Sequence, residues 1–166
     1  DYELCLIAGH NIKFDIHHLR KVNLTIKTTT GEALDWKSWI AKGGKVWCTQ
    51  TAEYILSGQS HLYPSLDSCS EKYGGTIKDD RLSAFWKAGV DTEDIPKEML
   101  LDYLECDVEN TDLVMLQQTT LLKDKGMIPL AKSMMDAVIG YEEMEFNGMK
   151  INHTLCNDLR DSKIIT

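Results

Sequence analysis

A continuous apolar run at residues 4–8 is followed by turn residues at 9–11 and by a helical pattern at residues 14–22. An uninterrupted apolar run of this length is expected for a buried strand. Apolar residues such as Ile16 and Leu19 then recur as they would on one face of a helix. A buried strand that leads directly into a helix favours an α/β fold over an all-α fold.

The rest of the chain continues this alternation, although helical patterns dominate it. Residues 45–49 predict a second short strand, and turn signals within residues 23–45 predict a surface loop or a short hairpin. The connections are short, so a chain of 166 residues is expected to form one helix-rich α/β domain. Further helices are predicted at residues 52–56, 66–73, 97–123 and 127–146, and in a last segment that Asn152 caps.

The net charge of −8 argues against a protein that binds nucleic acid over its whole surface. The charge is uneven, however, because residues 13–45 hold seven basic and three acidic residues. Two interpretations stay open for this segment: a local basic strip that binds DNA, or cations that solvate a loop. The basic residues are Lys13, Arg20, Lys21, Lys27, Lys37, Lys42 and Lys45.

From this sequence neither a membrane span nor a secretory signal is expected. No apolar run approaches the roughly 20 residues of a membrane span, and no basic leader precedes an apolar segment. The five cysteines form no C-x-x-C pair, which favours a reduced, intracellular protein. The chain begins on Asp1 rather than on methionine, which suggests a fragment or a processed chain.

The first pattern with chemical content is Asn11-Ile12-Lys13-Phe14-Asp15, directly after the predicted strand. Ligands of α/β folds gather at the carboxyl ends of strands, so a carboxylate at Asp15 is placed to hold a divalent cation. Asn11 is expected to hydrogen-bond and orient the loop. Phe14 is expected to pack beneath it and fix the backbone.

The second pattern is Tyr103-Leu104-Glu105-Cys106-Asp107, within a predicted helix. Tyr103 and Asp107 are four residues apart, so a helix presents both on one face. A hydrolase that uses two metal ions needs carboxylates for the ions and a group that aims the attacking water. A tyrosine hydroxyl can aim this water, because the metal lowers the water's pKa. The alternative is a tyrosine packed on the core beside a solvated aspartate.

Taken in this order, the two patterns resemble the second and third exonuclease motifs of a known family. This family is the proofreading 3′–5′ exonuclease domain of family A DNA polymerases, of the DNA polymerase I type, in the tyrosine-containing subclass of the DEDD superfamily. Residues 86–92 and 107–111 are similar to phage members. Residues 143–152 resemble the passage from the exonuclease into the polymerase thumb.

The resemblance implies a ribonuclease H-like exonuclease fold whose N-terminal strands are missing. It divides the chain into an N-terminally truncated exonuclease domain, residues 1–146, and the start of a connection to the thumb, residues 147–166. The implied activity is metal-dependent hydrolysis of phosphodiester bonds at DNA 3′ ends during replication. Asp15 and Asp107 are implied ligands of Mg²⁺ or Mn²⁺, Tyr103 would position the nucleophilic water, and Asn11 and Phe14 would contact substrate.

The implied partners are a single-stranded DNA 3′ end and the rest of the polymerase polypeptide, with no membrane. The implied location is the cytoplasm, that of a host cell if the chain is phage-encoded. Two alternatives stay open: a non-catalytic, DNA-binding scaffold of the same fold, and an RNA-trimming DEDD exonuclease.

The family's first motif, Asp-x-Glu, is not assigned in this chain. Asp1 and Glu3 match its letters, but only eleven residues separate Glu3 from Asp15, where the family has further strands. The motif is therefore expected upstream of residue 1, which leaves the metal site incomplete. The isolated chain is expected to have little or no exonuclease activity.

The four tryptophans leave two interpretations open. Core packing is the default, and stacking on the bases of a single strand is the alternative. Lys78 and Lys87 are further candidates for contacts with phosphate. The tryptophans are Trp36, Trp39, Trp47 and Trp86.

Overall fold

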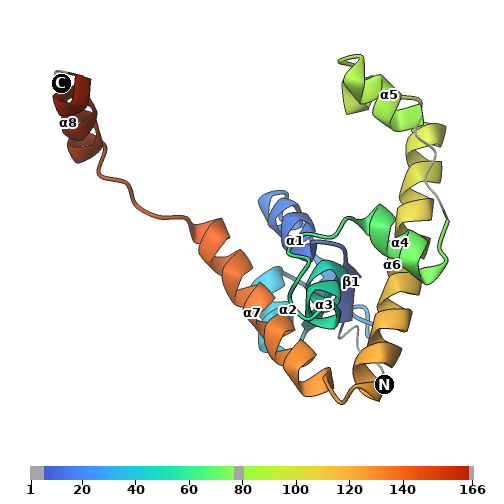
Figure 1. Ribbon diagram of the computed structural model, residues 1–166. Helices are drawn as coiled ribbons and strands as arrows, with labels where there is room; N and C mark the ends of the chain where they lie inside the picture. Colours follow the sequence, from blue (N-terminus) through green and yellow to red (C-terminus); the bar gives the residue numbers. More distant parts are fainter. Residues whose placement is uncertain (1–5, 77–80, 165–166) are drawn as a thin grey trace.

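The computed structural model describes residues 6–76 and 81–164 and shows a helix-rich α/β protein with little sheet (Figure 1). The predicted class, α/β with a predominance of helix, is therefore confirmed. The elements in chain order are β1 (Leu6–Gly9), α1 (Ile12–Lys21), β2 (Ile26–Lys27), β3 (Ala33–Leu34), α2 (Trp36–Ala41), β4 (Lys45–Cys48), α3 (Thr49–Leu56), α4 (Leu66–Tyr73), α5 (Arg81–Lys87), the 3₁₀ helix η1 (Thr92–Asp94), α6 (Lys97–Asp124), α7 (Ile128–Asn147) and α8 (His153–Ile164).

The larger sheet pairs β1 with β4 in parallel, with Ile7 opposite Val46 and Gly9 opposite Cys48. Parallel strands need a crossover, which α1, the β2–β3 hairpin and α2 supply. The carboxyl ends of β1 and β4 therefore meet at one edge, where α1 and α3 begin. Within the described residues this sheet has two strands.

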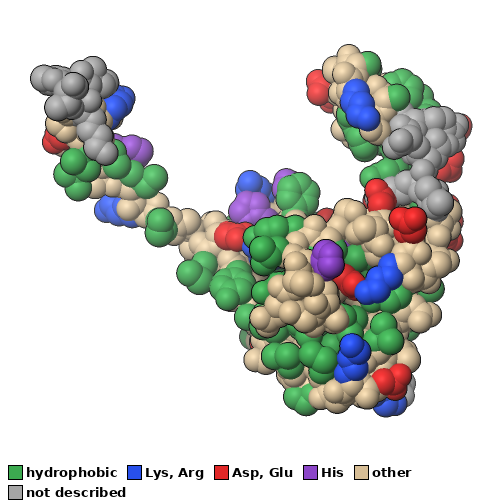
Figure 2. All heavy atoms as spheres, viewed as in Figure 1, with side chains coloured by type: hydrophobic (Ala, Val, Ile, Leu, Met, Phe, Trp, Pro, Cys, Tyr) green, Lys and Arg blue, Asp and Glu red, His purple; other side chains and the backbone are tan. Residues whose placement is uncertain are grey.

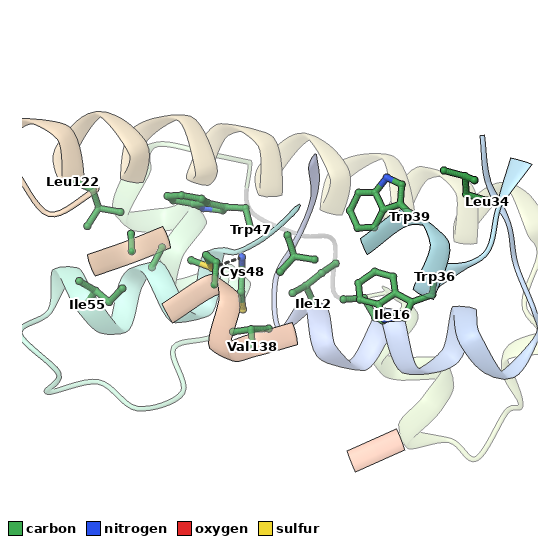
Figure 3. Close-up of a cluster of buried hydrophobic side chains, with 14 residues drawn as sticks. Ile12, Ile16, Leu34, Trp36, Trp39, Trp47, Cys48, Ile55, Leu122 and Val138 are labelled. Atoms are coloured by element: carbon green, nitrogen blue, oxygen red, sulfur yellow. Dashed lines mark hydrogen bonds between the residues drawn. The ribbon is translucent and has the colours of Figure 1, made fainter. Parts of the chain in front are cut away.

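The hydrophobic core surrounds β4 and collects side chains from six other elements (Figure 3). Trp39 is 1% exposed and packs so close to Gly44 that a Cβ there would lie 2.3 Å from its ring. Three of the four tryptophans are buried, as the core-packing interpretation predicts, whereas Trp86 is 42% exposed. The labelled core residues are Ile12, Ile16, Leu34, Trp36, Trp39, Trp47, Cys48, Ile55, Leu122 and Val138.

Residues 23–45 contain the predicted short hairpin, β2–β3, but a helix that the sequence did not predict, α2, follows it. Helix α2 begins after Asp35, whose side chain accepts a hydrogen bond from the Ser38 N–H at 2.7 Å. Such a cap satisfies an N–H that the first helical turn leaves unpaired. Trp36 and Trp39 then turn toward the core and stabilise a helix of six residues.

The two long helices diverge from a short connection at residues 125–127 and enclose the small sheet between them (Figure 1). Helix α5 lies at the far end of α6, and α8 stands apart from the rest of the molecule (Figure 1). Residues 153–162 of α8 are all exposed. The site described below lies where β1, α1 and α6 approach one another.

Candidate functional site

A cavity of about 650 Å³ lies at the carboxyl end of β1, between α1 and α6. Asp15 lines it from α1, and Asp107 lines it from α6. The two carboxylates predicted to act together are therefore brought to one place, although most of the chain separates them in sequence. Apolar side chains such as Leu19, Leu104 and Val108 form much of the wall.

The turn between β1 and α1 is tight, and this places Asp15 at the cavity. A Cβ at Gly9 would lie 2.5 Å from the Ile12 side chain, so the turn has little room for a larger residue. Asn11 adopts a left-handed conformation with φ of 57°, which asparagine tolerates better than most residues. Its carbonyl accepts a hydrogen bond from the Phe14 N–H at 2.9 Å, which starts the helix.

Two expectations about this turn are corrected. The Asn11 side chain makes no capping hydrogen bond, so the backbone of Asn11, rather than its amide, orients the start of α1. Phe14 does not pack beneath the loop, because it is 61% exposed. Its ring instead lies 4.3 Å from the ring of His18, between centroids, on the outer face of α1.

The pKa of the Asp15 carboxyl is raised above the ordinary value of an aspartate. Burial against the cavity wall is the largest influence and raises the pKa of the carboxyl, because a charge is poorly solvated there. A hydrogen bond from its own backbone N–H and the nearby His18 lower the pKa in part. Asp15 still keeps more than a third of its surface exposed, so water screens the effect.

Asp107 and Tyr103 lie on one continuous helix, α6, as predicted. Oδ1 of Asp107 is buried, although the residue as a whole is only half-buried, so this aspartate is not fully solvated. Tyr103 is partly buried and does not line the cavity itself. Its ring packs edge-to-face against Trp86 of α5, with 5.9 Å between centroids, rather than on the hydrophobic core.

His10 is a cavity residue that sequence reasoning treated only as part of a turn. Its Nε2 donates a hydrogen bond to the Pro64 carbonyl at 2.8 Å, and its Nδ1 lies 2.8 Å from Thr49 Oγ1. These contacts tie the end of β1 to the start of α3 and to the loop before α4. The one available signal was its position between the predicted strand and Asn11.

The donor atoms at this cavity meet the needs of a divalent cation only in part. Carboxylate oxygens are the ligands that Mg²⁺ and Mn²⁺ prefer, so Asp15 and Asp107 suit either ion. Among residues 6–76 and 81–164, however, no group of three or more His, Cys, Asp or Glu side chains is arranged to hold an ion. Asp1 and Glu3, considered for the first motif, lie outside the described residues.

The basic residues of segment 13–45 do not form an open strip. Five of the seven lie within ion-pair distance of acidic side chains, and basic and acidic groups are interspersed on the face shown in Figure 2. Their charge is therefore partly neutralised within the protein. The pairs are Lys13–Glu145, Arg20–Glu142, Lys37–Glu143, Lys42–Glu32 and Lys45–Asp136.

No family model, curated protein or solved structure matches this chain. Among the described residues, no helix combines the length and the apolar character that a membrane crossing requires.

Asp15→Asn is expected to raise the melting temperature at pH 7 by about 1–2 °C in the absence of divalent metal. The folded chain binds the Asp15 proton more tightly than the unfolded chain does, so ionising Asp15 at neutral pH costs stability. Asparagine removes this cost. The gain should disappear near pH 3, where Asp15 is protonated in both states, and thermal unfolding at the two pH values measures it.

The matched comparison is Asp35→Ala, which removes the cap of α2 and is expected to lower the melting temperature. Mn²⁺ should raise the melting temperature of the unsubstituted chain more than that of Asp15→Asn. A lower melting temperature for Asp15→Asn at pH 7 would mean that this carboxylate is structural and that the metal assignment is wrong.

Proposed function

We propose that this chain is a 3′–5′ exonuclease domain of a DNA polymerase, with a ribonuclease H-like exonuclease fold. In this proposal it hydrolyses phosphodiester bonds at single-stranded DNA 3′ ends, using Mg²⁺ or Mn²⁺, and so removes misincorporated nucleotides. The observation that supports it most is the convergence of Asp15 and Asp107 on one cavity at the carboxyl end of β1. Of the residues that carry the sequence resemblance, Asp15 and Asp107 thus line the same cavity.

The electrostatics of the cavity favour a metal-dependent activity. Asp15, Asp107, Glu109 and Asp112 all line it, so a DNA phosphate that enters meets carboxylates. A divalent cation between the carboxylates and the phosphate would convert this repulsion into attraction. For this reason a scaffold that binds DNA without metal is the weaker proposal.

Each residue has a defined task in the proposed mechanism. Asp15 and Asp107 would hold the cation, and the partial burial of Asp107 would strengthen its interaction with that ion, because charges attract more strongly where the dielectric is lower. The bound metal would lower the pKa of a water molecule and polarise the phosphate. Tyr103, one helical turn from Asp107, would orient that water, and the exposed Asn11 and Phe14 would contact the terminal nucleotide.

The test combines metal binding with digestion of a 3′-labelled single strand. We expect Asp15→Asn and Asp107→Asn each to weaken Mn²⁺ binding by about 10-fold or more, measured calorimetrically. Because the described residues contain no complete ligand set, we expect slow release of mononucleotides from the 3′ end at high protein concentration. Both variants should abolish this release.

Two further variants separate the roles. Tyr103→Phe should retain Mn²⁺ binding but slow the release by about 10–100-fold, because the water is no longer oriented. Asp102→Asn, an exposed carboxylate on the same helix that does not line the cavity, should match the unsubstituted chain. Metal binding that is equal in all four variants would contradict the proposal.

A further inference from the structure

Trp86 differs from the other tryptophans of this chain in its surroundings. Trp36, Trp39 and Trp47 are at most 9% exposed, whereas Trp86 is 42% exposed. Burial of such a large side chain is favourable, so its partial exposure is not explained by core packing. Its exposed surface is available for contact with a ligand.

The exposed indole is nevertheless held in place. Its Nε1 donates a hydrogen bond to Thr92 Oγ1 at 3.2 Å. Gly89, with φ of 78°, turns the chain after α5, and the Val90 N–H donates to the Phe85 carbonyl at 3.1 Å. This turn brings Thr92 back to the indole. A ring fixed in this way loses little conformational entropy when a ligand stacks on it.

The position of Trp86 connects it to the proposed site. Its ring meets the Tyr103 ring at an interplanar angle of 87°. An edge-to-face pair leaves at least one face of each ring uncovered by the other. Tyr103 is one helical turn, about 6 Å along α6, from Asp107. Tyr103 therefore links the indole to Asp107 along α6, although Trp86 is not part of the cavity wall.

We infer that Trp86 is a stacking platform for an unpaired base of the strand whose 3′ end enters the cavity. This inference rests on the proposed function and adds a recognition element to it. Stacking on an indole depends little on which base is present, because every base has a π-face. It also requires an unpaired base, so the platform would select a single strand over a duplex. Lys87, the next residue, offers a cation to the backbone of that strand.

The experiment is a titration of the 166-residue chain with a short single-stranded oligodeoxyadenylate in the presence of Ca²⁺, followed by tryptophan fluorescence and by anisotropy of a labelled strand. Because the other tryptophans are buried, quenching should come from Trp86 and should be absent in Trp86→Phe. Trp86→Ala should weaken binding by about 5-fold or more, and Trp86→Phe should recover most of that loss. An oligonucleotide with abasic sites should bind the unsubstituted chain as weakly as Trp86→Ala binds the normal strand.

Equal affinity of the unsubstituted chain and Trp86→Ala, or absence of any binding, would overturn the inference. An equal affinity for normal and abasic strands would also overturn it, because the contact would then not involve a base. These failures are distinguishable from failure of the proposed function, since the Mn²⁺ affinities of the Asp15 and Asp107 variants are measured without nucleic acid. Melting temperatures of both Trp86 variants show whether the fold is retained.

Discussion

Arg20→Met is expected to lower the free energy of unfolding by about 3–5 kcal/mol. The Arg20 side chain is 6% exposed, and its Nη1 lies 2.6 Å from Oε2 of Glu142, whose side chain is 0% exposed. The same nitrogen lies 2.8 Å from Glu143, and the guanidinium carbon lies 3.7 Å from the centre of the Phe146 ring. Removing the cation leaves the Glu142 carboxylate buried without its counterion. Chemical denaturation at pH 7 measures the loss.

Two further variants test whether the large loss of stability in Arg20→Met comes from the burial of the Arg20–Glu142 pair. Lys13→Met breaks the exposed Lys13–Glu145 pair at the same helix–helix contact and should cost at most about 1 kcal/mol. Adding Glu142→Leu to Arg20→Met should recover most of the stability, because apolar replacements for a buried ion pair are often neutral. If Arg20→Met costs no more than Lys13→Met, the pair does not stabilise the contact between α1 and α7.

The features of this structure that the sequence predicted well are helix bounds and caps, which depend on residues close together along the chain. Helix α4 has the predicted bounds, α6 ends one residue later than predicted, and α7 both begins and ends one residue later. Asn152 caps α8 as expected, since its Oδ1 accepts a hydrogen bond from the Leu155 N–H at 3.1 Å. The rule that ligands gather at strand ends predicted the place of Asp15, whereas the pairing of Asp15 with Asp107 came from the family resemblance.

The features that sequence did not predict depend on tertiary packing. Helix α2 is six residues long, too short for a periodic signal, and Trp36 and Trp39 stabilise it through the core. Phe14 had the spacing of a packed residue, but no described element covers that face of α1. Buried charges such as Glu142 are invisible in sequence, because a glutamate is normally exposed and only its partner explains its burial.

Glu53→Leu is expected to cost roughly 2–4 kcal/mol and also to weaken the proposed site. Glu53, on α3, is 6% exposed and accepts hydrogen bonds from Lys72 and Tyr73 of α4 and from Gln118 of α6. Leucine would leave the Tyr73 hydroxyl and the buried Gln118 amide short of an acceptor. Chemical denaturation at pH 7 measures the cost, and Glu71→Gln, an exposed change on α4, should stay within about 0.5 kcal/mol.

The same network should respond to acid. Burial alone would raise the pKa of Glu53, but the hydrogen bonds from its three partners outweigh burial and hold the pKa below its ordinary value of 4.5. The stabilisation is therefore complete above the unfolded pKa and is lost as the pH falls through the lower, folded pKa. The stability gap between the unsubstituted chain and Glu53→Gln should narrow between about pH 5 and pH 3. A gap that stays constant over this range would mean that the Glu53 carboxylate charge does not hold the helices together.

The link from Glu53 to the cavity runs through Gln118. Its Nε2 donates both to Glu53 and to the Thr49 carbonyl at 3.0 Å, and the Thr49 hydroxyl contacts His10 in the cavity wall. Loss of Glu53 should therefore loosen α6, which carries Asp107, against the start of α3. We expect Glu53→Leu to weaken Mn²⁺ binding even at temperatures where the variant is fully folded. Unchanged Mn²⁺ affinity in the folded variant would show that α6 is positioned by apolar packing and not by this network.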